Sequence, residues 1–330
     1  MAMIINIARK IRHLLALLPV SIIAFGAPVS ANQNTEQSAK QEDEIVVIGS
    51  KEQMAEFKNL IVNHFNVSGG GRYNGQYARF ARAVCPSVTG LSERQADAIR
   101  DRMRQVAKMS GIPVAAENCR PNMFVAVVED GATEIKQLRR KKARLFNSLT
   151  HRERDKIEES GGPVYSWKAT ETVASDSRHN ARAGSINLPA GENGAGLGAA
   201  LGGASGQGQR TQVKSRVMRS TMEGIAYSYL LIDIDALKGI SAAQLADYSA
   251  IMSLIDIDFS GDKTVPTGSM LSLFSSFEDD ALRPTSLSGG DLLLLRGLYK
   301  VPANVKAPLQ RSAMIHTMSE GLKNPKQVKR

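Results

Sequence analysis

Cys85 and Cys119 are the only two cysteines in this chain of 330 residues. They lack the close spacing of metal-binding cysteines, and no histidine cluster accompanies them. In an oxidising compartment an isolated pair of this kind forms one disulfide. That bond would enclose a long helical pattern and end just before a strand pattern, so it constrains the first half of the fold.

The N-terminus predicts that the chain reaches such a compartment. Basic residues at 9–12 precede the apolar run "LLALLPVSIIAFGA", and the small residues "VSA" at 29–31 come before a cleavage point at Asn32. We therefore expect a signal peptide at 1–31 and a mature protein in the periplasm or outside the cell. The alternative is a retained anchor, although the run is short for a bilayer span and contains Pro19.

The chain is basic. Its formal net charge of +10 falls to +7 when the three basic residues of the signal are removed. Much of the excess lies in "KQLRRKKAR" at 136–144 and in residues 323–330. These clusters predict a weak, salt-screened attraction to anionic lipid surfaces, or else a solvated helix face and a charged tail. We expect no nucleic-acid partner for an exported protein.

Composition divides the chain. We expect residues 32–43 to be a disordered lead-in, residues 44–310 to form one domain and residues 311–330 to be a basic C-terminal tail. Gly, Ala, Asn and Ser dominate residues 177–211, which we expect to be a disordered, flexible insertion in that domain. "GAGLGA" at 194–199 loosely matches a dinucleotide fingerprint but lacks the flanking strand and helix, so we expect no cofactor.

Helical and strand patterns are mixed within the domain. Residues 93–109 carry apolar residues at helical spacing: Ala96, Ile99, Met103 and Val106. Capping boxes predict helix starts at Ser50, Ser92, Thr150 and Ser241. Strand patterns occur at 44–50, 122–130, 164–172, 212–222 and 226–234. The sequence therefore predicts an α+β fold: a single mixed domain with a small sheet and several helices.

Three segments follow one another near the C-terminus: "QLADYSAIMSL" at 244–254, "GSMLSLFS" at 268–275 and "LSGGDLLLLRGLYKV" at 287–301. Their order resembles that of matrixin-like metzincin peptidases, which have a zinc-binding helix, a turn containing Met and a last helix reading L-S-x-x-D-x-x-x-L-x-x-L-Y. The resemblance implies a degenerate zincin-like fold with Met270 in the turn. The alternative is an α+β domain unrelated to these peptidases.

The zinc-binding motif of that family is missing. Metzincins carry two histidines four residues apart on one helical face, a third histidine beyond a glycine, and a glutamate that activates the zinc-bound water. Gln244, Tyr248 and Leu254 stand at the ligand positions and Leu245 at the glutamate position. With Met270 they are candidate degenerate-site residues, and we expect no metal and no catalytic residue among them. The alternative makes Gln244 a helix cap and the apolar residues a core face.

A second resemblance covers more of the chain. The segment "CPSVTGLSERQADAIRDRMRQVAKMSGIPVAAENCRPNMFVAVVED" at 85–130, together with "LIDIDALKGISAAQLADYSAIMSLIDID" at 231–258, is similar to a family of secreted Gram-negative proteins of unknown function. This likeness implies an exported protein of the Gram-negative envelope. It implies no particular activity.

Two function hypotheses follow. The leading one is an exported, non-catalytic binding or structural protein, in which a peptidase-like cleft holds an envelope peptide, polymer or protein. The alternative is an envelope hydrolase that uses carboxylates instead of zinc. Its candidate acids are Asp233, Asp235, Asp256 and Asp258.

Overall fold

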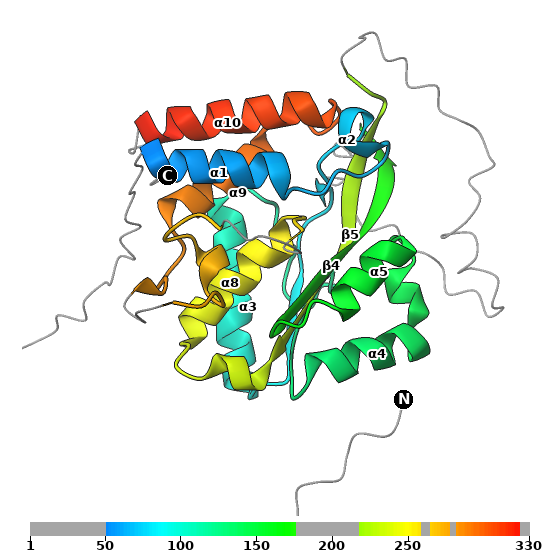
Figure 1. Cartoon of the computed structure of the whole chain (residues 1–330), viewed down its shortest axis with the longest axis vertical. Coiled ribbons are helices and arrows are strands. Elements are labelled where there is room, and N and C mark those ends of the chain that lie inside the picture. Colours follow the sequence, from blue (N-terminus) through cyan, green and yellow to red (C-terminus); the bar gives the residue numbers. More distant parts are fainter. Residues whose placement is uncertain (1–50, 176–217, 259–264, 278–281, 324–330) are drawn as a thin grey trace, which may run out of the picture. The chain divides into compact units, whose positions relative to one another are not determined.

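The computed structural model describes residues 51–175, 218–258, 265–277 and 282–323 (Figure 1). The signal peptide, the lead-in, the strand at 44–50 and the Gly-rich insertion all lie outside the described residues. Within the described residues, no helix has both the length and the apolar character needed to cross a membrane. These residues form a mixed α+β domain with a small sheet, as the sequence predicts.

The described elements alternate irregularly along the chain. The helices are α1 (Lys51–Asn63), α2 (Gly71–Asn74), α3 (Glu93–Met109), α4 (Gly131–Lys141), α5 (His151–Glu158), α8 (Ala242–Leu254), α9 (Gly289–Lys300) and α10 (Ala307–Lys323). Short 3₁₀ turns are η1 (Ala143–Phe146), η2 (Ile234–Leu237) and η3 (Met270–Ser272). The strands are β1 (Arg79–Phe80), β2 (Pro86–Thr89), β3 (Met123–Val128), β4 (Val164–Ala174) and β5 (Thr221–Asp233).

Strand β5 organises the sheet. It pairs in parallel with β1 and β3 and antiparallel with β4, while β2 pairs in parallel with the other side of β3. Helix α3 is the crossover that makes β2 and β3 parallel, since parallel neighbours cannot be joined by a tight turn. Among the described residues, β4 has no strand partner except β5. The sheet is therefore mostly parallel and ends in one antiparallel edge strand.

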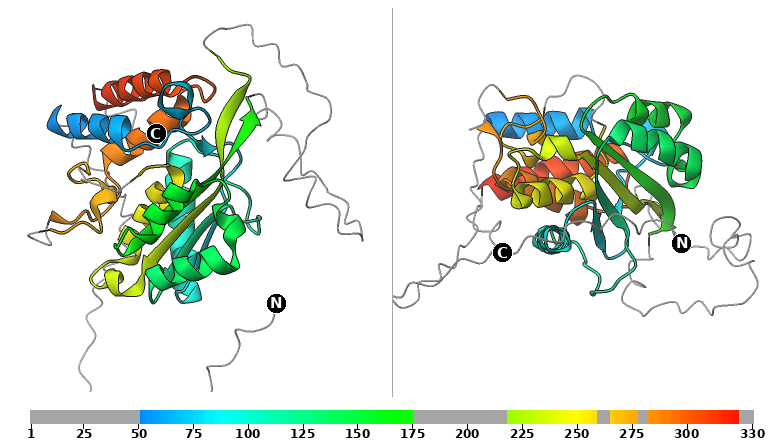
Figure 2. Two further views of the ribbon diagram at one scale, coloured as in Figure 1. Left: turned by 45° about the vertical axis from the view of Figure 1, so that its right-hand side comes forward. Right: turned by 90° about the horizontal axis from the view of Figure 1, so that it is seen from below.

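Helices cover both faces of this sheet. Helices α1, α3, α8, α9 and α10 lie together on one face, whereas α4 and α5 lie on the other (Figures 1 and 2). On the second face Trp167 stacks between Phe146 and Tyr229, with ring centroids 4.8 and 4.9 Å apart. The Trp167 indole N–H also donates to the carbonyl of Leu145 at 3.1 Å. The polar tip of this buried ring is thereby satisfied, as buried indoles require.

Several local predictions are confirmed. Helix α3 spans residues 93–109 as expected, and its predicted apolar face is buried. The capping boxes at Ser92, Thr150 and Ser241 are all present. The strand expected at 226–234 starts earlier, at Thr221, and takes in the last residues of the strand expected at 212–222. Residues 212–217 lie outside the described part of the chain.

The structure changes the expected C-terminal boundary. We expected a basic tail from residue 311, but helix α10 continues to Lys323. Met314 and Met318, one helical turn apart, are buried and lie against Gly297 of α9. This apolar stripe, which the surrounding charges hide in the sequence, makes 311–323 part of the domain. Residues 324–330 are not described.

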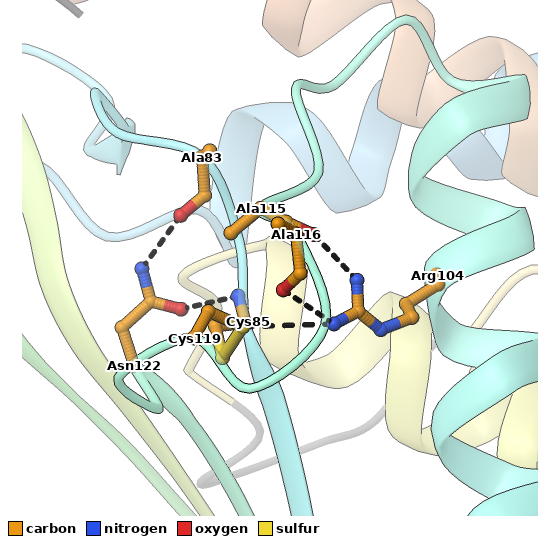
Figure 3. The surroundings of a disulfide bond; sticks show 7 residues. All are labelled: Ala83, Cys85, Arg104, Ala115, Ala116, Cys119 and Asn122. Carbon is orange, nitrogen blue, oxygen red and sulfur yellow. Dashed lines mark hydrogen bonds between the residues drawn. A yellow bond between two sulfur atoms is a disulfide. The ribbon is translucent and has the colours of Figure 1, made fainter. Parts of the chain in front are cut away.

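The predicted disulfide is confirmed, and it joins Cys85 to Cys119 across 34 residues (Figure 3). Arg104 of α3 donates to the carbonyl of Ala115 at 2.6 Å. Asn122 accepts a hydrogen bond from the backbone N–H of Cys85 at 2.7 Å. The disulfide therefore fastens the loop that follows α3 to the segment that enters β2.

We predict that the double substitution Cys85→Ala, Cys119→Ala lowers the free energy of unfolding by about 3–4 kcal/mol, because the open chain gains the entropy of an unclosed loop. Urea unfolding of the two proteins measures this difference. Dithiothreitol should lower the stability of the wild type to that of the variant and leave the variant unchanged. Equal stability of the two proteins without reductant would contradict the prediction.

Candidate functional site

A cleft of about 960 Å³ opens beside β4. Strand β4 forms its floor, α5 forms one wall, and the end of α8 with the segment after η3 forms the other. The lining includes Val164, Ser166 and Lys168 on the floor, Glu153 and Lys156 on α5, and Tyr248, Met252, Asp256, Asp258 and Phe274 on the far wall. A volume of this size accommodates several residues of a peptide or one small molecule.

The floor of the cleft presents open backbone positions. Val164 pairs with Ile232 of β5, and the N–H of Asp233 donates to the carbonyl of Pro163 at 2.9 Å. In an antiparallel ladder such a register directs the N–H and C=O groups of every second residue away from the neighbour. Val164, Ser166 and Lys168 are those residues.

Most of these outward groups have no hydrogen-bond partner among the described residues. The carbonyl of Lys168 accepts a hydrogen bond from the Ser148 hydroxyl at 3.3 Å. The outward N–H and C=O groups of Val164 and Ser166 make no hydrogen bond to any residue that the structure describes. An edge of this kind is a template for another extended chain.

Lys168 is the most unusual residue of the cleft. Its side chain lies on the sheet face opposite Tyr165 and Trp167, because alternate side chains of a strand point to opposite faces. It is 4% exposed, and its Nζ donates to the Ser166 hydroxyl at 2.9 Å. No carboxylate of a described residue lies within ion-pairing distance of this Nζ. Burial lowers the pKa of Lys168 from 10.5 to about 8, against the opposing effect of Asp256.

Two acids lie on the far wall. Asp256 accepts a hydrogen bond from the Asn66 side chain at 2.8 Å. Burial raises the pKa of Asp256, although the Asn66 hydrogen bond and the charge of Lys168 both oppose that rise. Asp258 forms an ion pair with Lys156 of α5 at 2.9 Å. This second pair joins the two walls of the cleft.

The positions compared with a zinc-binding helix lie on α8, and only Tyr248 lines the cleft. Its ring meets that of Phe274 edge to face at 4.7 Å. Gln244 completes the capping box with Ser241 and donates to the carbonyl of Pro284 at 2.9 Å.

Leu245 and Leu254, the remaining two of these helical positions, are buried in the main core. Together with Gln244 they act as a helix cap and core residues. This arrangement agrees with the alternative in which Gln244 is a helix cap and the apolar residues form a core face.

Met270 is buried in η3, directly after Ser269. Its backbone N–H donates to the Asp291 carboxylate at 2.9 Å, and the Ser269 hydroxyl also bonds that carboxylate. Asp291 in turn caps the first turn of α9 with Ser288. The turn and the last helix that carry the metzincin resemblance therefore contact each other.

The four acids of the hydrolase hypothesis do not lie together. Asp233 accepts a hydrogen bond from the N–H of Gly131 at 2.6 Å, and Asp235 pairs with the exposed Lys238. Neither lines the cleft, whereas Asp256 and Asp258 do. Among the described residues, no group of three or more His, Cys, Asp or Glu side chains could hold a metal ion.

Sequence reasoning missed Ser166 and Lys168. The signal was present in "VYSWKATET" at 164–172, where the alternation sets Ser166 and Lys168 on the face opposite the aromatic residues. A lysine on the inner face of an amphipathic strand marks a buried charge. The sequence alone did not reveal that this strand lies at the edge of the sheet, because strand order is a tertiary property.

The basic segment 136–144 lies on α4 and in η1. Lys136, Arg140, Lys141 and Arg144 are exposed. Arg139 instead pairs with Asp155 and Glu158 of α5. The exposed charges form a basic patch on the layer that carries α4 and α5, and the attraction of this patch to anionic lipid stays a prediction.

Comparison of the chain with known protein families, with curated proteins and with solved structures found no match. The cleft itself is therefore the main indication of function in this protein. Its distinctive features are an open strand edge and a buried lysine.

We predict a pH-dependent contribution of Lys168 to stability. Between about pH 8 and 10.5 the unfolded chain keeps the proton that the folded protein loses, so the free energy of unfolding rises with pH. Lys168→Met removes this contribution. The stability of the wild type relative to Lys168→Met should therefore rise by up to about 3 kcal/mol over this range.

Urea unfolding at four pH values between about 7 and 10 measures this difference. Lys156→Met, at a half-exposed lysine of the same cleft, is the matched control. If the stability of the wild type relative to Lys156→Met rose by the same amount, the effect would come from the total charge of the cleft and not from Lys168. A flat difference for Lys168→Met would contradict the prediction.

Proposed function

We propose that this protein is an exported, non-catalytic binding protein of the Gram-negative envelope that holds an extended peptide segment in the cleft beside β4. The observation that carries the proposal is the open edge of β4 on the floor of the cleft. The peptide would add to the sheet as a further strand. Its backbone would bond the outward N–H and C=O groups of Val164 and Ser166.

Strand addition accounts for the chemistry of the floor. Main-chain hydrogen bonds give such complexes affinity, and pockets for alternate side chains give them specificity. The far wall offers Tyr248, Met252 and Phe274 as apolar contacts for one set of side chains. The opposite wall offers Glu153 of α5 as a polar contact. The cleft therefore has both parts that a peptide site requires.

Two further observations support the exported, peptidase-like character of the proposal. A structural disulfide is typical of proteins that fold in oxidising compartments. Helix α8 packs on the sheet, and its Tyr248, which is 4% exposed and belongs to the core, still borders the cleft. A peptidase scaffold that had kept its groove without its metal ligands would have this residue there.

The carboxylate hydrolase remains the alternative. Asp256 and Asp258 favour it because both line the cleft. Each already has a partner, Asn66 for Asp256 and Lys156 for Asp258, so neither stands ready as a free general base. Replacing these two acids in any preparation that shows hydrolysis would decide whether they carry it.

We predict that Ser166→Pro weakens peptide binding by at least about tenfold, because proline removes an outward N–H and its ring blocks the strand edge. Binding to an array of random ten-residue peptides, followed by fluorescence polarisation with the strongest binder, measures the effect. Ser166→Ala keeps the backbone donor and should bind within about threefold of the wild type. Equal binding by Ser166→Pro and Ser166→Ala would contradict strand addition.

We also predict that the purified protein holds far less than one zinc ion per chain and does not cleave the peptides that it binds. The reason is that the metzincin ligand positions carry Gln244, Tyr248 and Leu254. Elemental analysis of protein prepared without chelators, and mass spectrometry of peptides after incubation, test this. Stoichiometric zinc together with chelator-sensitive cleavage would overturn the non-catalytic proposal.

A further inference from the structure

We propose that Lys168 is the recognition group for a carboxylate of the bound peptide. This inference rests on the proposed function and adds a chemical class of ligand to it. The ammonium of Lys168 would form an ion pair with a carboxylate at the end of the peptide or on one of its Asp or Glu side chains. An envelope peptide without a carboxylate at this position would bind weakly.

The buried ammonium of Lys168 lowers the stability of the unliganded protein. Lysine has three N–H donors, and among the described residues the Lys168 ammonium bonds only the Ser166 hydroxyl. A charged group in such a position is stable when a counter-charge reaches it and costly when none does. Lys168 lines the cleft, so a ligand can supply that counter-charge.

The charged groups around Lys168 have other partners. Asp256, from the segment after α8, is the acid that acts on Lys168, and Asn66 bonds its carboxylate. Asp258 is paired with Lys156 across the cleft. Glu153 on α5 bonds the start of its own helix at Thr150. Leu271 and Phe274, which also line the cleft, add apolar side chains.

The open edge of β4 stops at Lys168. The outward carbonyl of Lys168 is already bonded by Ser148, so a strand that pairs with Val164 and Ser166 loses its template at Lys168. A peptide that ends there would bring its terminal carboxylate close to the ammonium. A peptide that continues would instead bring a side-chain carboxylate. Both sources offer the same chemistry, and the experiment separates them.

The experiment uses the strongest binder from the peptide array, in three forms. These are the free acid, the C-terminal amide, and a form in which every Asp and Glu is changed to Asn and Gln. At about pH 6.5, where Lys168 holds its proton, we expect one of the two carboxylate removals to weaken binding to the wild type by at least about thirtyfold. The peptide form that binds more weakly shows whether Lys168 contacts the terminal carboxylate or a side-chain carboxylate.

Lys168→Met should bind the acid and its neutral counterpart within about threefold of each other. Lys156→Met removes the same charge from a half-exposed position and is the matched control. It should keep the preference for the acid. The preference should also decline above about pH 8, as Lys168 loses its proton.

The outcomes separate the two proposals. Tight binding without any preference for a carboxylate overturns the role of Lys168 and leaves strand addition standing. A preference that survives in Lys168→Met and disappears in Lys156→Met also overturns it. Failure of every array peptide to bind the wild type overturns both proposals. Loss of the preference in Lys168→Met alone, with the fold retained by circular dichroism, supports the inference.

Discussion

The burial of α8 from Gln244 to Leu254 is the constraint on which the rest of the domain depends. Asp247 lies in the middle of this helix and is 1% exposed, so its charge must be neutralised inside the protein. Arg102 of α3 does so through two hydrogen bonds of 2.6 and 3.2 Å, and the N–H of Leu287 adds a third of 2.8 Å. One carboxylate thus ties α8 to α3 and to the segment that leads into α9. The disulfide then holds the loop that follows α3 against the segment that enters β2.

This arrangement explains which features could be predicted from the sequence. Helix α3 and the capping box at Thr150 depend on residues a few positions apart, so their patterns are complete in the local sequence. The edge position of β4 depends on which strands pair, and no local pattern encodes that. Helix α10 was missed for another reason, because the charged residues around Met314 and Met318 concealed the narrow apolar face that these two residues bury.

The candidate site shows the same division. The sequence predicted candidate site residues on α8. Of these, Tyr248 does line the cleft, whereas Leu254 lies in the core. The sequence also gave four acids equal weight, whereas the fold separates Asp233 from Asp256 and engages the former at the start of α4. Ser166 and Lys168 line the cleft because β4 lies at the edge of the sheet, and that position is a tertiary property.

The buried charge of Lys168 lowers the stability of the fold, whereas the proposed function requires that charge. A methionine of similar length would fill the same space without the cost of a desolvated charge, so packing gives no reason for an ammonium at this position. Local charge balance gives none either, because Asp256 is held by Asn66 and forms no close ion pair with Lys168. The proposed peptide carboxylate would supply the counter-charge that the described residues do not place beside Lys168. The metzincin ligand positions on α8 carry no histidine, and the proposed recognition of a carboxylate rests instead on Lys168 of β4.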